Sequence, residues 1–395
     1  MTLDEEPAWA LPASLRERLR ELRHDLHRHP ELGATEHRTK DVVRRFLGDC
    51  GLEAIDCTAT GLFVDFESRR RDGPKVALRA DLDALPMTEE TPLSYRSVHE
   101  GVAHKCGHDG HTAILCGVAA TLADGASELR GDVRLIFQPD EEGHCGGGAV
   151  PMIEAGVLRG VDEIFGLHNW PGFPVGEVRV APGPVMASVE DFEILLEGVG
   201  GHAAEPQNAC DPVLAGSNLV QALSSLGTRE RGLAGGAVVQ ITQFHGGEVD
   251  NVIPAHAKLR GTIRTVDPLA AGRLRGRIAE TATAICGAFG VTPIVRTLRG
   301  YPVLMNSDSC ASRVRQAATS LLGSDRVSTE GLPLAASEDF AYFSEKVPGA
   351  YFFLGAGDPV GATPGCHHPD FDFDDRLLDL GVTLFVDLVR ESSAS

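Results

Sequence analysis

The sequence lacks a basic leader and a long apolar run. Its first twenty residues, MTLDEEPAWALPASLRERLR, are acidic, and no stretch approaches the roughly 18 apolar residues needed to cross a bilayer. We therefore expect neither a signal peptide nor a membrane-spanning helix. The nine cysteines are an odd number without the spacing of a disulfide framework. This favours a cytoplasmic protein in which clustered cysteine and histidine residues bind metal.

Positive charge is also scarce. The chain has 36 Lys and Arg against 56 Asp and Glu, a formal net charge of -20. Because nucleic acid and most membrane surfaces are anionic, we expect the chain to bind neither. Its 395 residues include 45 glycines and 23 prolines, with no internal repeat. These features indicate a folded protein of about two domains with many turns.

Hydrophobic patterning predicts an α/β fold interrupted by a second kind of unit. Helices are expected at 15–26, 35–50 and 112–124, and apolar runs predict strands at 76–85, 132–138, 163–169 and 351–355. Between them, the pattern β-α-β-β-α-β predicts a ferredoxin-like α+β unit. Its strands are expected at 189–198, 236–244, 256–265 and 292–299, and its helices at 211–226 and 268–288. We thus predict a discontinuous catalytic domain (1–186 and 299–395) with an inserted domain (187–298).

The motif CGHDGH (106–111) is the first place where chemistry is concentrated. Gly107 and Gly110 predict a loop in which Cys106 and His108 can face one metal ion. The alternative is a buried or reactive cysteine beside ordinary surface histidines. Lys105 would help to keep Cys106 as a thiolate if its side chain pointed inward.

Two further motifs follow apolar strands. In FQPDEEG (137–143), Glu141 and Glu142 could divide the work, one binding metal and the other acting as general base, unless they form an ordinary acidic turn. His168 ends the run IFGLH, where a core histidine is the alternative. CHHPDF (366–371) adds His367 near the C-terminus, where a solvated tail is the alternative. Together these residues make a mixed set of N, O and S donors with room for more than one ion.

Several segments, in this order, resemble the hippurate hydrolase, aminoacylase and indole-acetyl-amino-acid hydrolase family of metallo-amidohydrolases, within the zinc metallopeptidase clan. They are LHRHPELG (26–33), LRADLDALPM (78–87), HKCGHDGHTAIL (104–115), FQPDEEG, FGLHNWPG (165–172), GGHAAEP (200–206), NVIPAHAKLRGTIRT (251–265), SEDFAYF (337–343) and CHHPDF. The resemblance covers roughly residues 14–390. It implies a mixed-sheet metallopeptidase catalytic domain whose inserted domain acts as a lid or dimerisation domain.

The resemblance also implies a dinuclear metal site and a homodimer or higher homo-oligomer. The metals are two divalent ions, zinc or manganese, with cobalt or nickel as substitutes in vitro. The positions that match the family's ligands are Cys106, His108, Glu142, His168 and His367. Cys106 stands where related metallopeptidases use a bridging carboxylate, and His368 is the alternative to His367.

The catalytic roles follow from the same resemblance. Glu141 is the catalytic carboxylate. Asp81 matches a carboxylate that orients a ligand histidine in relatives, although Arg79 stands where those relatives carry the ligand. His202, Asn251 and Arg264 match positions that reach the substrate, often across a dimer interface. His202 could hydrogen-bond an oxyanion, and Arg264 offers a fork for a substrate carboxylate.

The implied activity is hydrolysis of an N-acyl amino acid, of the hippurate or N-acetyl type, to a carboxylate and a free amino acid. Glu141 would take a proton from the attacking water and return it to the leaving nitrogen. A dipeptidase or carboxypeptidase of the same clan would use the same machinery, and a catalytically silent ligand-binding homologue is a third reading. His144 and Cys145 lengthen the glycine-rich loop that we expect beside the acyl pocket.

Overall fold

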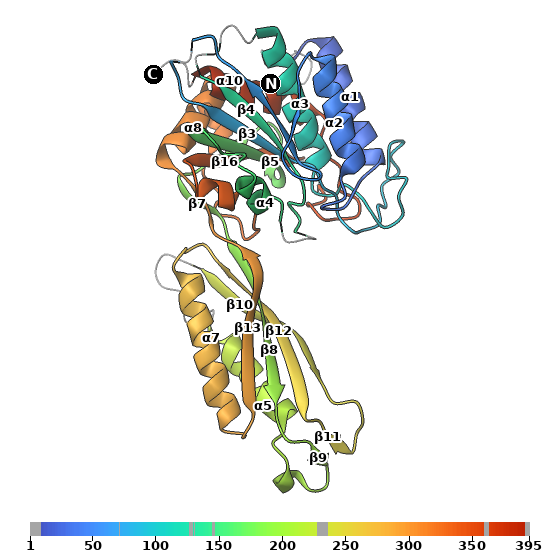
Figure 1. Cartoon of the computed structure of the whole chain (residues 1–395), viewed down its shortest axis with the longest axis vertical. Coiled ribbons are helices and arrows are strands. Elements are labelled where there is room, and N and C mark those ends of the chain that lie inside the picture. Colours follow the sequence, from blue (N-terminus) through green and yellow to red (C-terminus); the bar gives the residue numbers. More distant parts are fainter. Residues whose placement is uncertain are drawn as a thin grey trace. The chain divides into compact units, whose positions relative to one another are not determined.

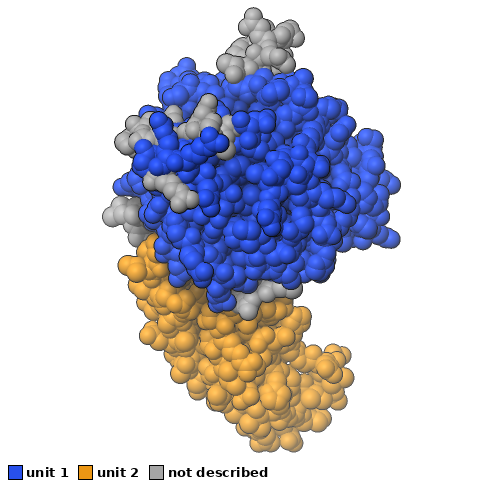
Figure 2. Space-filling model, turned by 45° about the horizontal axis from the view of Figure 1, so that its top comes forward, with its two compact units in different colours: residues 1–183, 305–332, 339–395 blue, residues 184–304, 333–338 orange. Residues whose placement is uncertain are grey.

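The computed structural model describes residues 9–70, 72–125, 129, 131–143, 147–226, 236–358 and 363–391. The chain divides into two compact units (Figure 2). Unit 1 consists of Met1–Gly183, Met305–Leu332 and Asp339–Ser395, and unit 2 consists of Pro184–Leu304 and Pro333–Glu338. The sequence analysis placed the insert at 187–298 and left 333–338 in the first domain. The segment 333–338 belongs to unit 2 because Leu334 forms a parallel bridge with Met186.

Unit 1 is built around an eight-stranded mixed sheet with the order β1-β2-β4-β3-β5-β16-β6-β15 (Figure 1). Its strands are β1 (Ile55–Asp56), β2 (Leu62–Phe66), β3 (Val76–Asp81), β4 (Val133–Gln138), β5 (Glu163–Pro174), β6 (Val178–Arg179), β15 (Val327–Ser328) and β16 (Gly349–Gly357). Every residue of β3, β4 and β16 is buried. Strands covered on both faces have such continuous apolar runs, which is why the sequence revealed them.

The helices of unit 1 pack against this sheet and one another. They are α1 (Ala13–Arg28), α2 (His37–Asp49), α3 (His108–Gly125), α4 (Ala149–Glu154), α8 (Asp308–Leu322), α9 (Ala341–Ser344) and α10 (Arg376–Glu391), with a 3-10 turn at Ser324–Arg326. In α1, Leu19, Leu22 and Leu26 are buried because their spacing places them on one helical face. Helix α3 contacts α1, α10 and β3. No helix in the described part of the chain is long and apolar enough to span a membrane.

The four central strands β4, β3, β5 and β16 run parallel, so their carboxyl ends lie at one edge of the sheet. Strand β3 ends at Asp81, opposite Gln138 of β4, rather than continuing to residue 85 as predicted. Strand β5 is longer than the predicted 163–169, because Trp170 and Pro174 still pair with Gly355 and Gly357 of β16. Polar residues at this edge of unit 1 form the site described below.

Unit 2 has the predicted ferredoxin-like order of elements. They are β8 (Ser188–Glu197), α5 (Pro212–Ser224), β10 (Ala237–Gly246), β12 (His256–Thr265), α7 (Ala270–Gly287) and β13 (Thr292–Tyr301). The antiparallel sheet has the order β10-β12-β8-β13. Burial alternates along β12, as expected when helices cover one face of a sheet. The Asp211 carboxylate caps α5 by accepting hydrogen bonds from the backbone N–H groups of Val213 and Leu214.

Short elements complete the fold. In unit 2, β9 (Gly201–His202) pairs with β11 (Val252–Ile253), and a 3-10 turn covers Pro206–Asn208. Strands β7 (Gly183–Met186) and β14 (Leu304–Asn306) pair with each other where the chain passes between the two units.

The core of unit 2 provides a test of its packing. Leu274 on α7 is fully buried, whereas Leu269, just before the same helix, is 74% exposed. We predict that Leu274→Ala lowers the free energy of unfolding by about 2–5 kcal/mol, because it leaves a cavity. Leu269→Ala should change it by less than about 0.5 kcal/mol. Denaturant unfolding of the two variants measures both values, and equal losses would contradict the packing described for α7.

Candidate metal centre

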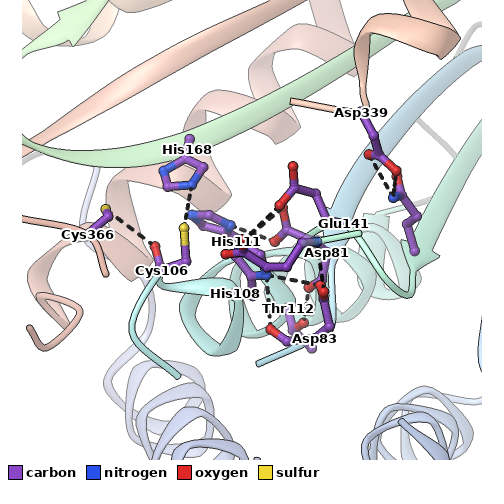
Figure 3. A network of polar contacts seen from close by, with 12 residues as sticks. Asp81, Asp83, Cys106, His108, His111, Thr112, Glu141, His168, Asp339 and Cys366 are labelled. Carbon is purple, nitrogen blue, oxygen red and sulfur yellow. Dashed lines mark hydrogen bonds and ion pairs between the residues drawn. The ribbon is translucent and has the colours of Figure 1, made fainter. Parts of the chain in front are cut away.

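The motif CGHDGH is divided between a turn and a helix rather than forming one loop. Gly107 has a φ of 103°, a conformation that favours glycine, and α3 begins at His108. The prediction that both glycines shape a loop is therefore wrong for Gly110, which lies inside α3. A Cβ at Gly110 would lie 2.4 Å from the ring of Phe373, so this glycine permits close packing instead. Cys106, just before the helix, and His108, at its start, still face the same region (Figure 3).

Cys106 and His168 meet across the sheet edge. The Cys106 Sγ atom lies 3.3 Å from His168 Nε2. His168 Nδ1 lies 2.6 Å from the backbone oxygen of Asn169, and donating a proton there leaves Nε2 with its lone pair toward the centre. Burial lowers the pKa of His168 well below its usual value, which keeps the imidazole neutral. A neutral imidazole beside a thiol is a pair of donors suited to a transition metal.

His108 is surrounded by oxygen atoms. Its Nδ1 contacts the backbone and carboxylate oxygens of Asp83 at 3.0 and 3.2 Å. Its Nε2, which is buried, has no hydrogen-bond partner among the described residues. Carboxylate oxygens of Asp81 and Glu141 each lie 3.8 Å from it. Although burial opposes a charge on His108, Asp81 and Asp83 raise its pKa to about 10. A cation bound at Nε2 would satisfy both the unpaired nitrogen and the surrounding negative charge.

Glu142 and His367 form the other side of the centre. His367 Nε2 lies 3.1 Å from Glu142 Oε1, whereas His368 lies close to Asp370 instead. Of the two histidines, His367 is therefore the one placed beside the other donors. Burial opposes ionisation of Glu142, but the hydrogen bond from His367 and the charge of His108 lower the pKa of its carboxyl.

The five residues predicted as metal ligands thus fall into overlapping groups. Within each group the donor atoms lie within 4.8 Å of one another. Three of these groups are Cys106–His108–His168, Cys106–Glu142–His367 and His108–Glu141–Glu142, and His108 also belongs to a group with Asp81 and His111. Because Cys106 is shared by the first two, the donor set suits two neighbouring ions. The residues present therefore fit the dinuclear centre that the sequence predicted.

Asp81 plays a different part from the one expected. Its Oδ1 atom accepts a hydrogen bond from His111 Nδ1 at 2.7 Å, and its Oδ2 accepts one from Arg79 Nη1 at 2.7 Å. Arg79 continues to Asp339 at 3.0 Å. His108 is oriented by the neighbouring Asp83, so the expectation that Asp81 orients a ligand histidine does not match the hydrogen bonds. Arg79, His108 and His111 offset the burial of Asp81 and hold the pKa of its carboxyl well below its usual range.

Sequence reasoning did not find Asp83, His111 and Asn169. His111 lies between Asp81 and Asn169, with Nε2 2.7 Å from the Asn169 side-chain oxygen, and Asn169 follows His168 directly. Two signals were available. Asp83 alternates with Asp81 after a buried strand, and His111 is three residues from His108, which places both on one helical face.

Lys105 does not act on the Cys106 thiol. Its Nζ atom donates to Glu89 at 2.8 Å and to the backbone oxygen of Phe371 at 2.7 Å, and its side chain is fully buried. His27 also contacts the Glu89 carboxylate, at 3.1 Å. Although burial opposes ionisation of Glu89, the hydrogen bonds from His27 and Lys105 lower the pKa of its carboxyl. The cluster joins the segment before α3 to the C-terminal motif, and the expectation of thiolate stabilisation by Lys105 is wrong.

The residues predicted to reach the substrate lie in unit 2, in two places. His202 on β9 pairs with Val252 of β11, next to Asn251, and both His202 and Asn251 are exposed. Arg264 lies near the other end of β12, where its Nη1 is 3.4 Å from the backbone oxygen of Ala335. At about 3.3 Å per residue, β12 separates the two places by more than 20 Å. The structure therefore does not bring these three residues together within one chain. His144 and Cys145 lie outside the described residues.

A mixed sheet that gathers a thiol, imidazoles and carboxylates at the ends of parallel strands defines a metal-dependent hydrolase of the peptidase type. Comparison with known proteins gives the family. The model of the peptidase family M20/M25/M40 matches residues 77–391. The chain therefore belongs to the M20/M25/M40 peptidase family.

Two relatives and one solved structure illustrate the similarity. An N-acetylcysteine deacetylase of Bacillus subtilis is 39% identical over 94% of this chain and 96% of its own length. The thermostable carboxypeptidase 1 of Saccharolobus solfataricus is 36% identical over 91% of this chain and 92% of its own length. The Bacillus subtilis YXEP protein, described as a dinuclear metal-binding peptidase of the M20 family, is 35% identical. It has a TM-score of 0.84, covering 96% of this chain and 99% of that one.

The buried cluster of Glu89, Lys105 and His27 leads to a prediction about how stability depends on pH. We expect Glu89→Gln to lower the free energy of unfolding at pH 7 by about 3–5 kcal/mol, because it leaves the buried Lys105 without its counter-ion. The folded-state pKa of Glu89 is depressed, so its stabilising contribution is present above the unfolded pKa of about 4.3 and is lost as pH falls. The difference in free energy of unfolding between the unmodified chain and Glu89→Gln should therefore become smaller as the pH falls from 7 to 3.

Denaturant unfolding of the metal-free proteins at several pH values measures this difference. Glu90→Gln, at the adjacent and exposed position, is the matched control and should behave as the unmodified chain. A difference that stays constant down to pH 3 would show that the Glu89 charge does not support this cluster.

Proposed function

We propose that this chain hydrolyses the amide bond of N-acyl amino acids, releasing a carboxylate and a free amino acid. The observation that supports this most is the position of a second carboxylate, Glu141, among the metal donors. Its Oε2 lies 3.8 Å from the unpaired His108 Nε2, and its side chain is buried. The deacetylase relative, named for N-acetylcysteine, favours a small acyl group such as acetyl.

Five residues would hold two divalent ions, zinc or manganese: Cys106, His108, Glu142, His168 and His367. When bound, such ions supply Lewis-acid polarisation of the amide carbonyl and lower the pKa of water. Asp83 would hold His108, and the Asn169 carbonyl would hold His168, each with its other ring nitrogen toward the metal.

Glu141 would carry the proton. A carboxylate beside the metal donors can accept a proton from the attacking water and deliver it to the amide nitrogen, which makes the amine a better leaving group. Its neighbour Glu142 lies beside His367 and Cys106, so we assign metal binding to Glu142 and proton transfer to Glu141. The adjacent pair would thus divide metal binding from proton transfer.

Residues of unit 2 would recognise the substrate from a partner subunit. His202 and Asn251 lie far along β12 from Arg264, so one chain cannot present all three to one substrate. In a homodimer, His202 of one protomer would donate to the oxyanion while Arg264 binds the α-carboxylate. This arrangement would require a free carboxylate on the substrate.

A carboxypeptidase is the second candidate, because the thermostable carboxypeptidase relative is similar over 91% of the chain. One panel separates the two functions. N-acetyl amino acids, N-benzoyl amino acids and N-acetyl dipeptides are offered to the zinc- or manganese-loaded protein, and free amino acids are quantified. We expect N-acetyl amino acids to be cleaved to acetate. Release of the C-terminal residue from N-acetyl dipeptides, with intact N-acetyl amino acids left over, would instead identify a carboxypeptidase.

The role of Glu141 gives a direct prediction. Glu141→Gln should reduce kcat by about 10²–10⁴-fold, because an amide cannot accept the proton. The variant should still bind about as much metal as the unmodified chain, which elemental analysis measures. Glu154→Gln, an exposed position on α4, serves as the control and should keep full activity. Near-normal kcat in Glu141→Gln would refute the assigned role.

A further inference from the structure

A second cysteine lies against the candidate metal-ligating cysteine. The Cys366 Sγ atom is 3.7 Å from the backbone oxygen of Cys106 and 3.9 Å from the side-chain nitrogen of Asn169. Figure 3 shows Cys366 directed at Cys106 on the side away from Glu141. Neither the function proposed above nor the resemblance to the family gives Cys366 a task.

A backbone hydrogen bond brings the segments that carry the two cysteines together. The backbone N–H of His367 donates to the backbone oxygen of Lys105 at 2.6 Å. The peptide group that precedes Cys106 is thus paired with the one that follows Cys366. The two cysteines therefore lie next to each other, and disulfides form at Cα separations of about 4.4–6.8 Å. A bond between the two sulfur atoms would require the two side chains to rotate toward each other.

The two thiols differ in access. Cys106 is buried, with 8% of its surface exposed, whereas Cys366 is half-buried and can meet a small oxidant. Cys116 and Cys310, by comparison, are fully buried in the hydrophobic core of unit 1. The pair Cys106–Cys366 thus combines an accessible thiol that reacts first with a neighbouring thiol that can resolve the product.

We propose that Cys106 and Cys366 form a reversible disulfide that competes with metal at this centre. Hydrogen peroxide is the oxidant: the Cys366 thiol attacks one peroxide oxygen, forming a sulfenic acid and releasing water. The Cys106 thiol then attacks the sulfenic sulfur, the S–S bond forms, and the hydroxyl group leaves as a second water with the thiol proton. Two thiols and one peroxide become one disulfide and two waters.

The competition rests on the proposed function, because it requires Cys106 to be a metal ligand. A sulfur atom in a disulfide is no longer an anionic ligand, so oxidation removes the donor that two of the ligand groups share. The disulfide would also restrict the position of Cys366, which precedes the candidate ligand His367 in the chain. Bound metal, conversely, occupies the Cys106 sulfur and should protect it.

The experiment compares metal-free and zinc-loaded protein exposed to the same molar excess of hydrogen peroxide. Free thiols are then alkylated, the protein is digested without reductant, and cross-linked peptides are identified by mass spectrometry. We expect a peptide pair joined through Cys106 and Cys366 in the metal-free protein, and at least a tenfold lower yield in the zinc-loaded protein. Dithiothreitol should remove the cross-link and restore zinc binding.

Two variants complete the test. In Cys366→Ser the thiol that reacts first is absent, so peroxide should form no cross-link at Cys106, and zinc binding should survive an exposure that abolishes it in the unmodified chain. Cys57→Ser, which removes a half-buried cysteine elsewhere in unit 1, is the control and should behave as the unmodified chain.

The outcomes separate this proposal from the proposed function. Absence of the Cys106–Cys366 cross-link from oxidised metal-free protein would overturn the disulfide, whatever the enzyme hydrolyses. A cross-link that forms equally with and without zinc would overturn the competition. A cross-link that zinc suppresses would support the disulfide even if no N-acyl amino acid were cleaved.

Discussion

The concentration of electron-pair donors around His108 is the constraint on which unit 1 depends. Asp81, Asp83 and Glu141 surround an imidazole that is fully buried, and its Nε2 atom faces none of them at hydrogen-bond distance. Buried charges of one sign are costly unless an opposite charge balances them. A divalent cation at the point where the donors converge would provide that balance. Metal binding would then stabilise this sheet edge.

At two positions beside these donors the backbone has a positive φ, a conformation that few residue types other than glycine adopt readily. Asp140, just before the Glu141–Glu142 pair, has a φ of 54°, and His367 has a φ of 66°. Asp and His are among the few non-glycine residues that adopt this left-handed region readily. The backbone N–H of Asp140 donates to the Glu36 carboxylate, and the backbone N–H of His367 donates to the backbone oxygen of Lys105, and these two hydrogen bonds hold both turns. Strained backbone thus directs Glu141, Glu142 and His367 toward one centre.

The sequence predicted most of the fold because burial and periodicity are local signals. Runs such as residues 133–138, and the leucines of α1, depend little on distant parts of the chain. The ends of elements were less accurate. Where the sequence analysis expected a loop throughout 106–111, α3 begins at His108, since only Gly107 needs a positive φ.

The sequence predicted the candidate metal ligands, but it did not predict the residues that hydrogen-bond to them and orient them. Cys106 and His108 are unusual enough in sequence to stand out. The hydrogen bonds from His108 to Asp83 and from His111 to Asp81 depend on how α3 lies against β3, which no local pattern records. The separation of His202 from Arg264 likewise follows from the length of β12.

The central claim is that Cys106 supplies a thiolate to metal at this centre, and cobalt substitution tests it most directly. A thiolate bound to Co²⁺ gives an intense charge-transfer absorption in the near ultraviolet. The account predicts this band in the cobalt-loaded protein and in Cys366→Ser, together with its loss in Cys106→Ser. A band that persists in Cys106→Ser, or that is absent from the unmodified protein, would contradict it.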